Sequence, residues 1–153
     1  MAIDTEADGD SVAAGALDGL AGYHLRRAHG RFAADFARTV AGTGMRQVLF
    51  GILSVVDANP GINQGAAGRM LGVQRANMVS LINETVDAGW IDRQVADDDR
   101  RAFALNLTEA GRETLGRTLE KLQAHEEALL AGLSAGERAT LIELLRRIVR
   151  AGD

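Results

Sequence analysis

Apolar residues recur every three to five positions along most of this chain, a spacing typical of amphipathic helices. Local signals agree with this spacing: Asn63 and Thr108 stand at N-cap positions, and Ser134 with Glu137 three residues later forms a capping box. The pattern predicts helices over residues 11–40, 45–58, 64–71, 74–88, 109–131 and 135–150.

Two segments between the fourth and fifth helices follow the two-residue period of a β-strand instead. They are residues 91–95 and 102–107, and in the second Phe103, Leu105 and Leu107 alternate with smaller or polar residues. A charged tip of sequence ADDDRR separates them, which predicts a β-hairpin with a projecting tip. The order of elements predicts a mainly α fold with a small β-hairpin wing: a winged helix–turn–helix flanked by long N- and C-terminal helices.

A chain of 153 residues with 46% apolar content has the size and composition of one ordinary domain. We divide it into an acidic leader over residues 1–10, which we expect to be disordered, and one domain over 11–153. Within that domain, 45–108 is the predicted winged helix–turn–helix lobe, and 11–44 and 109–153 form the flanking helical region. The sequence has no run of about 18 apolar residues and begins with acids, so we expect a cytoplasmic protein without a membrane segment.

The net charge of −4 says little about the partner, because the leader carries four of the acids and residues 11–153 sum to zero. The absence of cysteine excludes disulfides, thiol sensors and zinc ribbons. There is no Ser-His-Asp order, phosphate-binding loop or pair of carboxylates at a useful spacing. His29 and His125 have no neighbour in sequence that suggests a metal or a nucleophile, and we expect both at the surface. We therefore predict no enzyme activity, no catalytic residue, no metal and no cofactor.

The helices over 64–71 and 74–88 are joined by a tight turn at Gly72, which is typical of a helix–turn–helix. The second helix of this motif enters the DNA major groove, where Gln and Asn pair with adenine and Arg with guanine. Residues 63–83 include two arginines and no acid, so Arg69 favours phosphate contact. We expect the first turns of the second helix to meet the bases through Gln74, Arg75, Asn77, Met78 and Ser80.

The opposite face of this second helix carries Ala76, Val79, Ile82 and Val86 at helical spacing, and we expect this face to be buried. An alternative interpretation makes the whole stretch the polar face of an ordinary helical bundle, because helix–turn–helix patterns are common and weak.

The tip of the predicted hairpin has residues suited to the minor groove, whose negative potential favours a long cation. Asp99 stands two residues before Arg101, so its carboxylate can orient that guanidinium, while Arg100 or Arg93 meets a phosphate. The alternative is a solvated charged turn. The two acids just before Asp99 support that alternative, because they repel phosphate.

The run DDDRRAFALNLTEAG resembles the wing and following helix of the MarR family of transcriptional regulators, whose wings carry Asp-Arg-Arg-Ala before a strand ending Leu-Thr-x-x-Gly. The run LGVQRANMVSLINETVDAGWIDR resembles the recognition helix of that family and its entry into the wing, although Trp90 replaces a smaller aliphatic residue. The resemblance extends over residues 17–149. It is most specific at Asp99, Arg100, Arg101, Thr108 and Gly111.

This resemblance implies a minor-groove role for Arg101, braced by Asp99, and a homodimer formed by the N- and C-terminal helices. Such a dimer binds double-stranded DNA at a pseudo-palindromic operator, with half-sites about one helical turn apart. A stripe that a lone domain would struggle to cover agrees with dimerisation: Leu141, Leu144, Leu145, Ile148 and Val149.

Members of the family often release DNA when a small aromatic acid binds. The first helix has one cluster of basic and aromatic residues, Tyr23, His24, Arg26 and Arg27, and we expect it to bind such an effector. The alternative is that His24 is a hydrogen-bonded core residue and the two arginines form surface ion pairs.

Together these features predict a homodimeric DNA-binding repressor that a small ligand releases from its operator. Three alternatives stay open: a winged-helix adaptor that docks a protein, a small-molecule binding protein without DNA function, and an activator of the same family.

Overall fold

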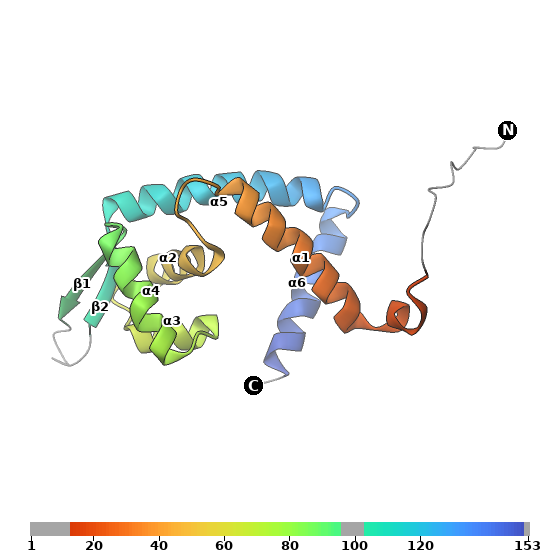
Figure 1. The fold of residues 1–153 in the computed structure, drawn as a ribbon, viewed down its shortest axis with the longest axis horizontal. Coiled ribbons are helices and arrows are strands. Elements are labelled where there is room, and N and C mark those ends of the chain that lie inside the picture. Colours follow the sequence, from red (N-terminus) through yellow and green to blue (C-terminus); the bar gives the residue numbers. More distant parts are fainter. Residues whose placement is uncertain (1–12, 96–102, 152–153) are drawn as a thin grey trace.

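The computed structural model describes residues 13–95 and 103–151, and Figure 1 shows their arrangement. The long helix α5 runs across the molecule, with a compact lobe under its N-terminal end; α1 slopes down from near its middle, and α6 descends from its other end. The elements in order are η1 (Gly15–Gly19), α1 (Ala21–Thr39), α2 (Gln47–Ala58), α3 (Gln64–Leu71), α4 (Arg75–Asp87), β1 (Ile91–Val95), β2 (Phe103–Leu107), α5 (Glu109–Leu129) and α6 (Ala135–Arg150).

The predicted helix caps are confirmed. Such caps are predictable from the sequence because each depends only on neighbouring residues. The Asn63 side chain accepts a hydrogen bond from the Ala66 amide at 2.9 Å and opens α3. The capping box at Ser134 and Glu137 is complete and opens α6. Since each such cap stabilises its helix by about 1 kcal/mol, they fix where these helices begin.

The predicted helix over residues 11–40 is wrong at its start. A short 3-10 turn, η1, comes first, and the α-helix begins only at Ala21. Gly15 has a left-handed φ of +58°, and Leu20 is extended between the two helical segments. The apolar spacing alone did not show this break, whereas the glycines at 15, 19 and 22 give the backbone freedom to turn.

The two strands form an antiparallel pair, as predicted, with Ile91 opposite Leu107 and Arg93 opposite Leu105. Ile62, just before α3, adds a single bridge to Leu105. The Leu105 amide donates to the Ile62 carbonyl, and the Gly61 amide donates to the Leu105 carbonyl, each at 2.9 Å. This bridge ties the base of the wing to the start of the helix–turn–helix. The residues of the predicted wing tip lie outside the described residues.

The core lies inside the lobe, around α2. Its largest side chains have relative exposures of 0 to 1% and come from α2, α4 and β2: Leu49, Ile52, Leu53, Val56, Met78, Ile82 and Leu105. Burying each contributes roughly 1.5–3 kcal/mol, which makes this cluster the main support of the lobe. Among the described residues, no helix combines the length and apolar character needed to cross a bilayer.

Candidate nucleic-acid interface

The turn between α3 and α4 is set by two glycines. Gly72 has a φ of +65°, a left-handed conformation that suits glycine, and the Val73 amide donates to the Gly68 carbonyl at 2.9 Å. A Cβ placed on Gly68 would lie 3.4 Å from the Met78 side chain. The two helices therefore pack closely at Gly68, where a larger side chain would press against Met78.

The exposed face of α4 carries most of the residues that we predicted to read DNA. Gln74, Arg75, Asn77 and Ser80 are all exposed. Met78 is not: only 1% of it is exposed and it packs in the core, so its predicted base contact is wrong.

The predicted buried face of α4 is also partly wrong. Ile82 is buried as expected, but Ala76 is exposed and 44% of Val79 is accessible to solvent. The buried stripe is Met78, Ile82 and Thr85. Thr85 can be buried because its hydroxyl donates to the Ile82 carbonyl at 2.8 Å within the same helix. A threonine with its hydroxyl satisfied in this way packs like an apolar residue, which the polar–apolar pattern does not reveal.

A groove of about 680 Å³ lies between α3, α4 and the base of the wing, and we call it the wing groove. Arg69, Arg75 and Arg93 line it from three different elements, and no acid is among the described residues that line it. Their positive charge favours an anion, and such a groove fits a phosphate backbone.

Arg93 is held between α4 and the wing. Its guanidinium donates to the Asn83 side-chain oxygen, and its Cζ lies 5.3 Å from the centre of the Phe103 ring. These two contacts orient a charged side chain of β1 toward the wing groove. The sequence did not point to Asn83, because it is an exposed polar residue whose partner Arg93 lies on another element.

The base of the wing is fixed at Thr108. Its hydroxyl donates to the Gly89 carbonyl at 2.6 Å and accepts from the Gly111 amide at 3.0 Å. A Cβ on Gly111 would lie 2.0 Å from the Trp90 carbonyl oxygen, so only glycine fits this position. The predicted wing residues Asp99, Arg100 and Arg101 lie outside the described residues.

The predicted effector cluster is assembled on the first turns of α1. The Tyr23 and His24 rings meet edge to face at 5.2 Å, and the Cζ atoms of Arg26 and Arg27 each lie 5.7 Å from the Tyr23 ring centre. The alternative of a core histidine is wrong, because His24 is exposed and its Nε2 lies 2.8 Å from the Asp18 carbonyl oxygen.

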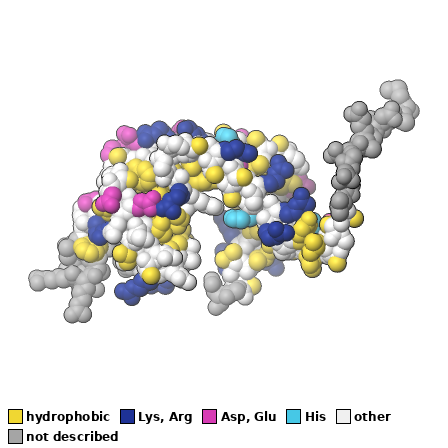
Figure 2. Space-filling model, viewed as in Figure 1, with side chains coloured by type: hydrophobic (Ala, Val, Ile, Leu, Met, Phe, Trp, Pro, Cys, Tyr) yellow, Lys and Arg dark blue, Asp and Glu magenta, His cyan; other side chains and the backbone are white. Residues whose placement is uncertain are grey.

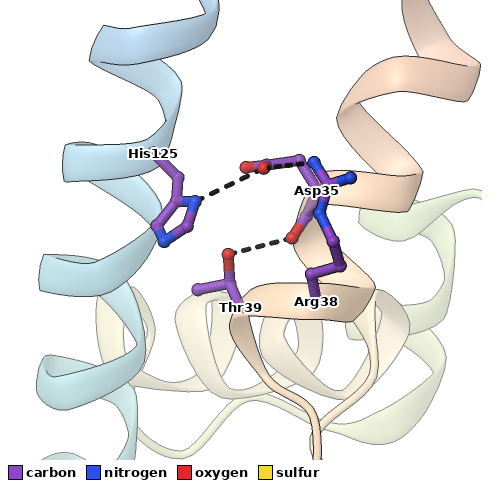
Figure 3. A network of polar contacts seen from close by, with 4 residues as sticks. All are labelled: Asp35, Arg38, Thr39 and His125. Atoms are coloured by element: carbon purple, nitrogen blue, oxygen red, sulfur yellow. Dashed lines mark hydrogen bonds and ion pairs between the residues drawn. The ribbon is translucent and has the colours of Figure 1, made fainter.

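A buried carboxylate that sequence reasoning missed links α1 to α5 (Figure 3). Asp35, only 8% exposed, lies 3.0 Å from Nη2 of Arg38 and 3.3 Å from Nδ1 of His125, which is itself exposed as expected. The hydrogen bond from Arg38, followed by that from His125, lowers the pKa of Asp35 against the opposing effect of burial. The Arg38 partner follows from helical spacing, whereas His125 is 90 residues away.

Another pocket, of about 200 Å³, lies between α1, α2 and α5, and we call it the aromatic pocket. The Phe36 and Phe50 rings meet in its wall at 6.1 Å. Sequence analysis did not find it because three separate helices supply its walls. Its apolar lining consists of Phe32, Phe36, Phe50, Leu122 and Leu129, with Asp35, Gln47 and Glu126 as the polar part.

Known proteins resemble the chain in sequence. A profile described as MarR family matches residues 44–102. The putative transcriptional regulatory protein for the hcr operon of Thauera aromatica is 37% identical over 139 residues, which cover 89% of this chain and 82% of that protein.

Solved structures extend this similarity to the whole fold. The transcriptional repressor CouR bound to a 23-mer DNA duplex has a TM-score of 0.86 and 34% identity, with 92% of this chain and 99% of that chain covered. CouR bound to p-coumaroyl-CoA has a TM-score of 0.78 at the same identity and coverage. The mainly helical fold with its two-stranded wing is thus a winged helix–turn–helix, and the chain belongs to the MarR family of transcriptional regulators.

Proposed function

We propose that this regulator is a homodimeric repressor that a small aromatic ligand releases from a pseudo-palindromic operator. The observation that carries the proposal is the wing groove, where Arg69, Arg75 and Arg93 converge beside the exposed polar face of α4. Arginines on three elements around one concave surface fit the spaced phosphates of a duplex. The complex of its relative CouR with a 23-mer DNA duplex supports this proposal.

In the proposed complex, α4 enters the major groove. Gln74, Arg75, Asn77 and Ser80 meet base edges, and Arg69 and Arg93 meet phosphates on either side. From the sequence alone, we assign the minor groove to Arg101 with Asp99 as its brace, and a further phosphate to Arg100.

The proposed dimer forms through the two ends of the chain. None of the residues of η1 or α6 is buried in the isolated chain, although both carry large apolar side chains. A face of this size on a lone chain is typical of an interface. The exposed side chains are Leu17, Leu20, Leu25, Leu141, Ile142, Leu144, Leu145, Ile148 and Val149.

The proposed ligand site is the aromatic pocket. Its walls come from α2 of the lobe and from α1 and α5 of the flanking region, so a ligand between them favours one angle of the lobe over others. A change in that angle alters the spacing of the two recognition helices and shifts the dimer away from its DNA-binding state. The p-coumaroyl-CoA complex of CouR supports an aromatic ligand. Tyr23, His24, Arg26 and Arg27 provide donors and an aromatic surface for its anionic part.

Fluorescence anisotropy with the DNA upstream of this gene and its neighbours tests the proposal. We expect the logarithm of the binding constant to fall linearly as the logarithm of the salt concentration rises. Arg75→Ala should weaken binding by about 1–3 kcal/mol, whereas Arg112→Ala on α5, outside the wing groove, should leave it unchanged. Arg101→Ala tests the wing assignment in the same assay. Binding that is absent or independent of salt would contradict DNA recognition and favour a protein adaptor.

A further inference from the structure

A second groove on α1 adjoins the aromatic pocket and carries three arginines. It has a volume of about 380 Å³ and is lined by Arg27, Gly30, Arg31, Ala34, Arg38 and Leu129. We call it the arginine groove. Figure 2 shows Lys and Arg side chains gathered along this helix. The function proposed above assigns Arg27 to the anionic part of the ligand but makes no use of Arg31 or Arg38.

The three arginines form one stripe on the helix. At 3.6 residues per turn, Arg27, Arg31 and Arg38 lie within about 40° of one another around the axis. They span about 16 Å along it, at about 1.5 Å per residue. Leu25 lies on the opposite side, roughly 200° from Arg27, so the stripe is separate from the apolar face proposed for the dimer.

The stripe keeps its positive charge. Arg31 forms no hydrogen bond or ion pair with the other residues that the structure describes, and Arg27 rests on the Tyr23 ring and donates to its hydroxyl at 3.3 Å. Arg38 gives one hydrogen bond to Asp35, yet 72% of its side chain is exposed. Asp35 is the single acid of α1 against four arginines, so this helix attracts anions.

The arginine groove and the aromatic pocket lie next to each other. Leu129 lines both, and the ion pair between Asp35 of the pocket and Arg38 of the groove joins them at 3.0 Å. One extended molecule can therefore place an aromatic end among Phe32, Phe36 and Phe50 and an anionic end along the stripe.

We propose that the arginine groove binds the phosphates of a nucleotide carrier attached to the aromatic ligand, so that the ligand class is an aromatic acyl thioester of coenzyme A. This inference rests on the ligand site of the proposed function. Arginine binds phosphate through paired hydrogen bonds. A carboxylate or a single phosphate is too small to reach guanidinium groups spread over about 16 Å of helix. Coenzyme A carries a diphosphate and a separate ribose phosphate, joined to the thioester by a long flexible arm that can pass over Leu129.

Titration calorimetry with three probes tests the assignment: p-coumaroyl-CoA, free p-coumarate and free coenzyme A. The thioester should bind at least tenfold more tightly than either part. Arg31→Gln should weaken thioester binding about threefold to tenfold and leave p-coumarate binding unchanged, because Arg31 faces only the carrier. The matched control Arg112→Gln, on α5 outside both sites, should bind all three probes like the unmodified protein.

Three results would overturn the inference: equal affinity for the acid and the thioester, an Arg31→Gln effect on both ligands alike, or no thioester binding at all. Anisotropy on the operator fragment with the same proteins separates this outcome from failure of the proposed function. If DNA is bound and the free acid releases it as well as the thioester, the repressor proposal stands and the carrier site fails. If Arg31→Gln weakens operator binding without ligand, the groove serves DNA instead, and the carrier site again fails.

Discussion

The lobe and the two ends of the chain differ in how they cover their apolar side chains. In the lobe, α2 alone supplies four residues that are 0% exposed, and α4 and β2 close over them. At the C-terminal end, α6 is as regular and as well capped, yet none of its residues is buried. Along α1 the single buried residue is the polar Asp35.

This difference shows which part of the fold the chain determines alone. The lobe has its own core, so its stability is a property of one molecule. The end helices carry regularly spaced apolar side chains that stay exposed within the described part of one chain. A second copy of the same surface would cover them, as in a self-complementary interface. Their stability should therefore depend on protein concentration, whereas that of the lobe should not.

The same substitution in the two regions gives the largest contrast. Leu53→Ala empties space in the lobe core, where the side chain is 0% exposed, and should lower the free energy of unfolding by about 2–5 kcal/mol. Leu144→Ala, at a side chain that is 47% exposed, should cost the isolated chain less than about 0.5 kcal/mol but weaken self-association. Urea unfolding and sedimentation velocity measure the two effects. Equal losses of stability at low protein concentration would show that α6 packs within its own chain.

A smaller effect is expected where the lobe meets α5. Gly111→Ala would place a Cβ 2.0 Å from the Trp90 carbonyl oxygen, and the backbone must move, at a cost of about 1–3 kcal/mol. Gly116→Ala on the same helix is the matched control, because its Cβ would meet nothing within 4 Å. That control should gain about 0.5–1 kcal/mol through helix propensity. Thermal unfolding followed by circular dichroism distinguishes them, and a neutral Gly111→Ala would mean that the joint is loose.

Sequence reasoning succeeded where structure depends on neighbouring residues. The caps at Asn63 and Thr108 and the capping box at Ser134 depend on contacts within three residues, and the structure contains them all. The antiparallel wing follows from two alternating segments separated by a polar tip. The helix–turn–helix follows from one glycine at the right place, Gly72.

Prediction from the sequence failed where the deciding contact joins residues far apart in the chain. It also failed where a local hydrogen bond allows a polar residue to be buried. The Thr85 hydroxyl donates to the Ile82 carbonyl within its own helix, so this polar residue is buried on the same face of α4 as Met78 and Ile82. The aromatic pocket and the contact from Asp35 to His125 join helices that only the tertiary fold brings together. The bases and phosphates that each arginine meets depend on the partner, which a pattern in one chain does not include.

The smallest expected effect concerns Asp35, which contacts Arg38 on α1 and His125 on α5. The Arg38 hydrogen bond lowers the pKa of Asp35 in the folded state from its ordinary value of 3.8. The ionised carboxylate therefore stabilises the fold at pH values above 3.8. This contribution is lost as the pH falls through the lowered folded pKa. The unmodified protein should therefore lose stability on acidification below about pH 4, and Asp35→Asn should lose less over the same range.

Melting temperatures measured between neutral and acidic pH follow this loss. Asp57→Asn is the matched control, since Asp57 is exposed on α2 of the lobe, and it should follow the unmodified curve. Parallel curves for Asp35→Asn and the unmodified protein would show that the contact does not stabilise the fold. A reduced loss confined to Asp35→Asn would show instead that the ionised carboxylate of Asp35, with its partners Arg38 on α1 and His125 on α5, stabilises the fold.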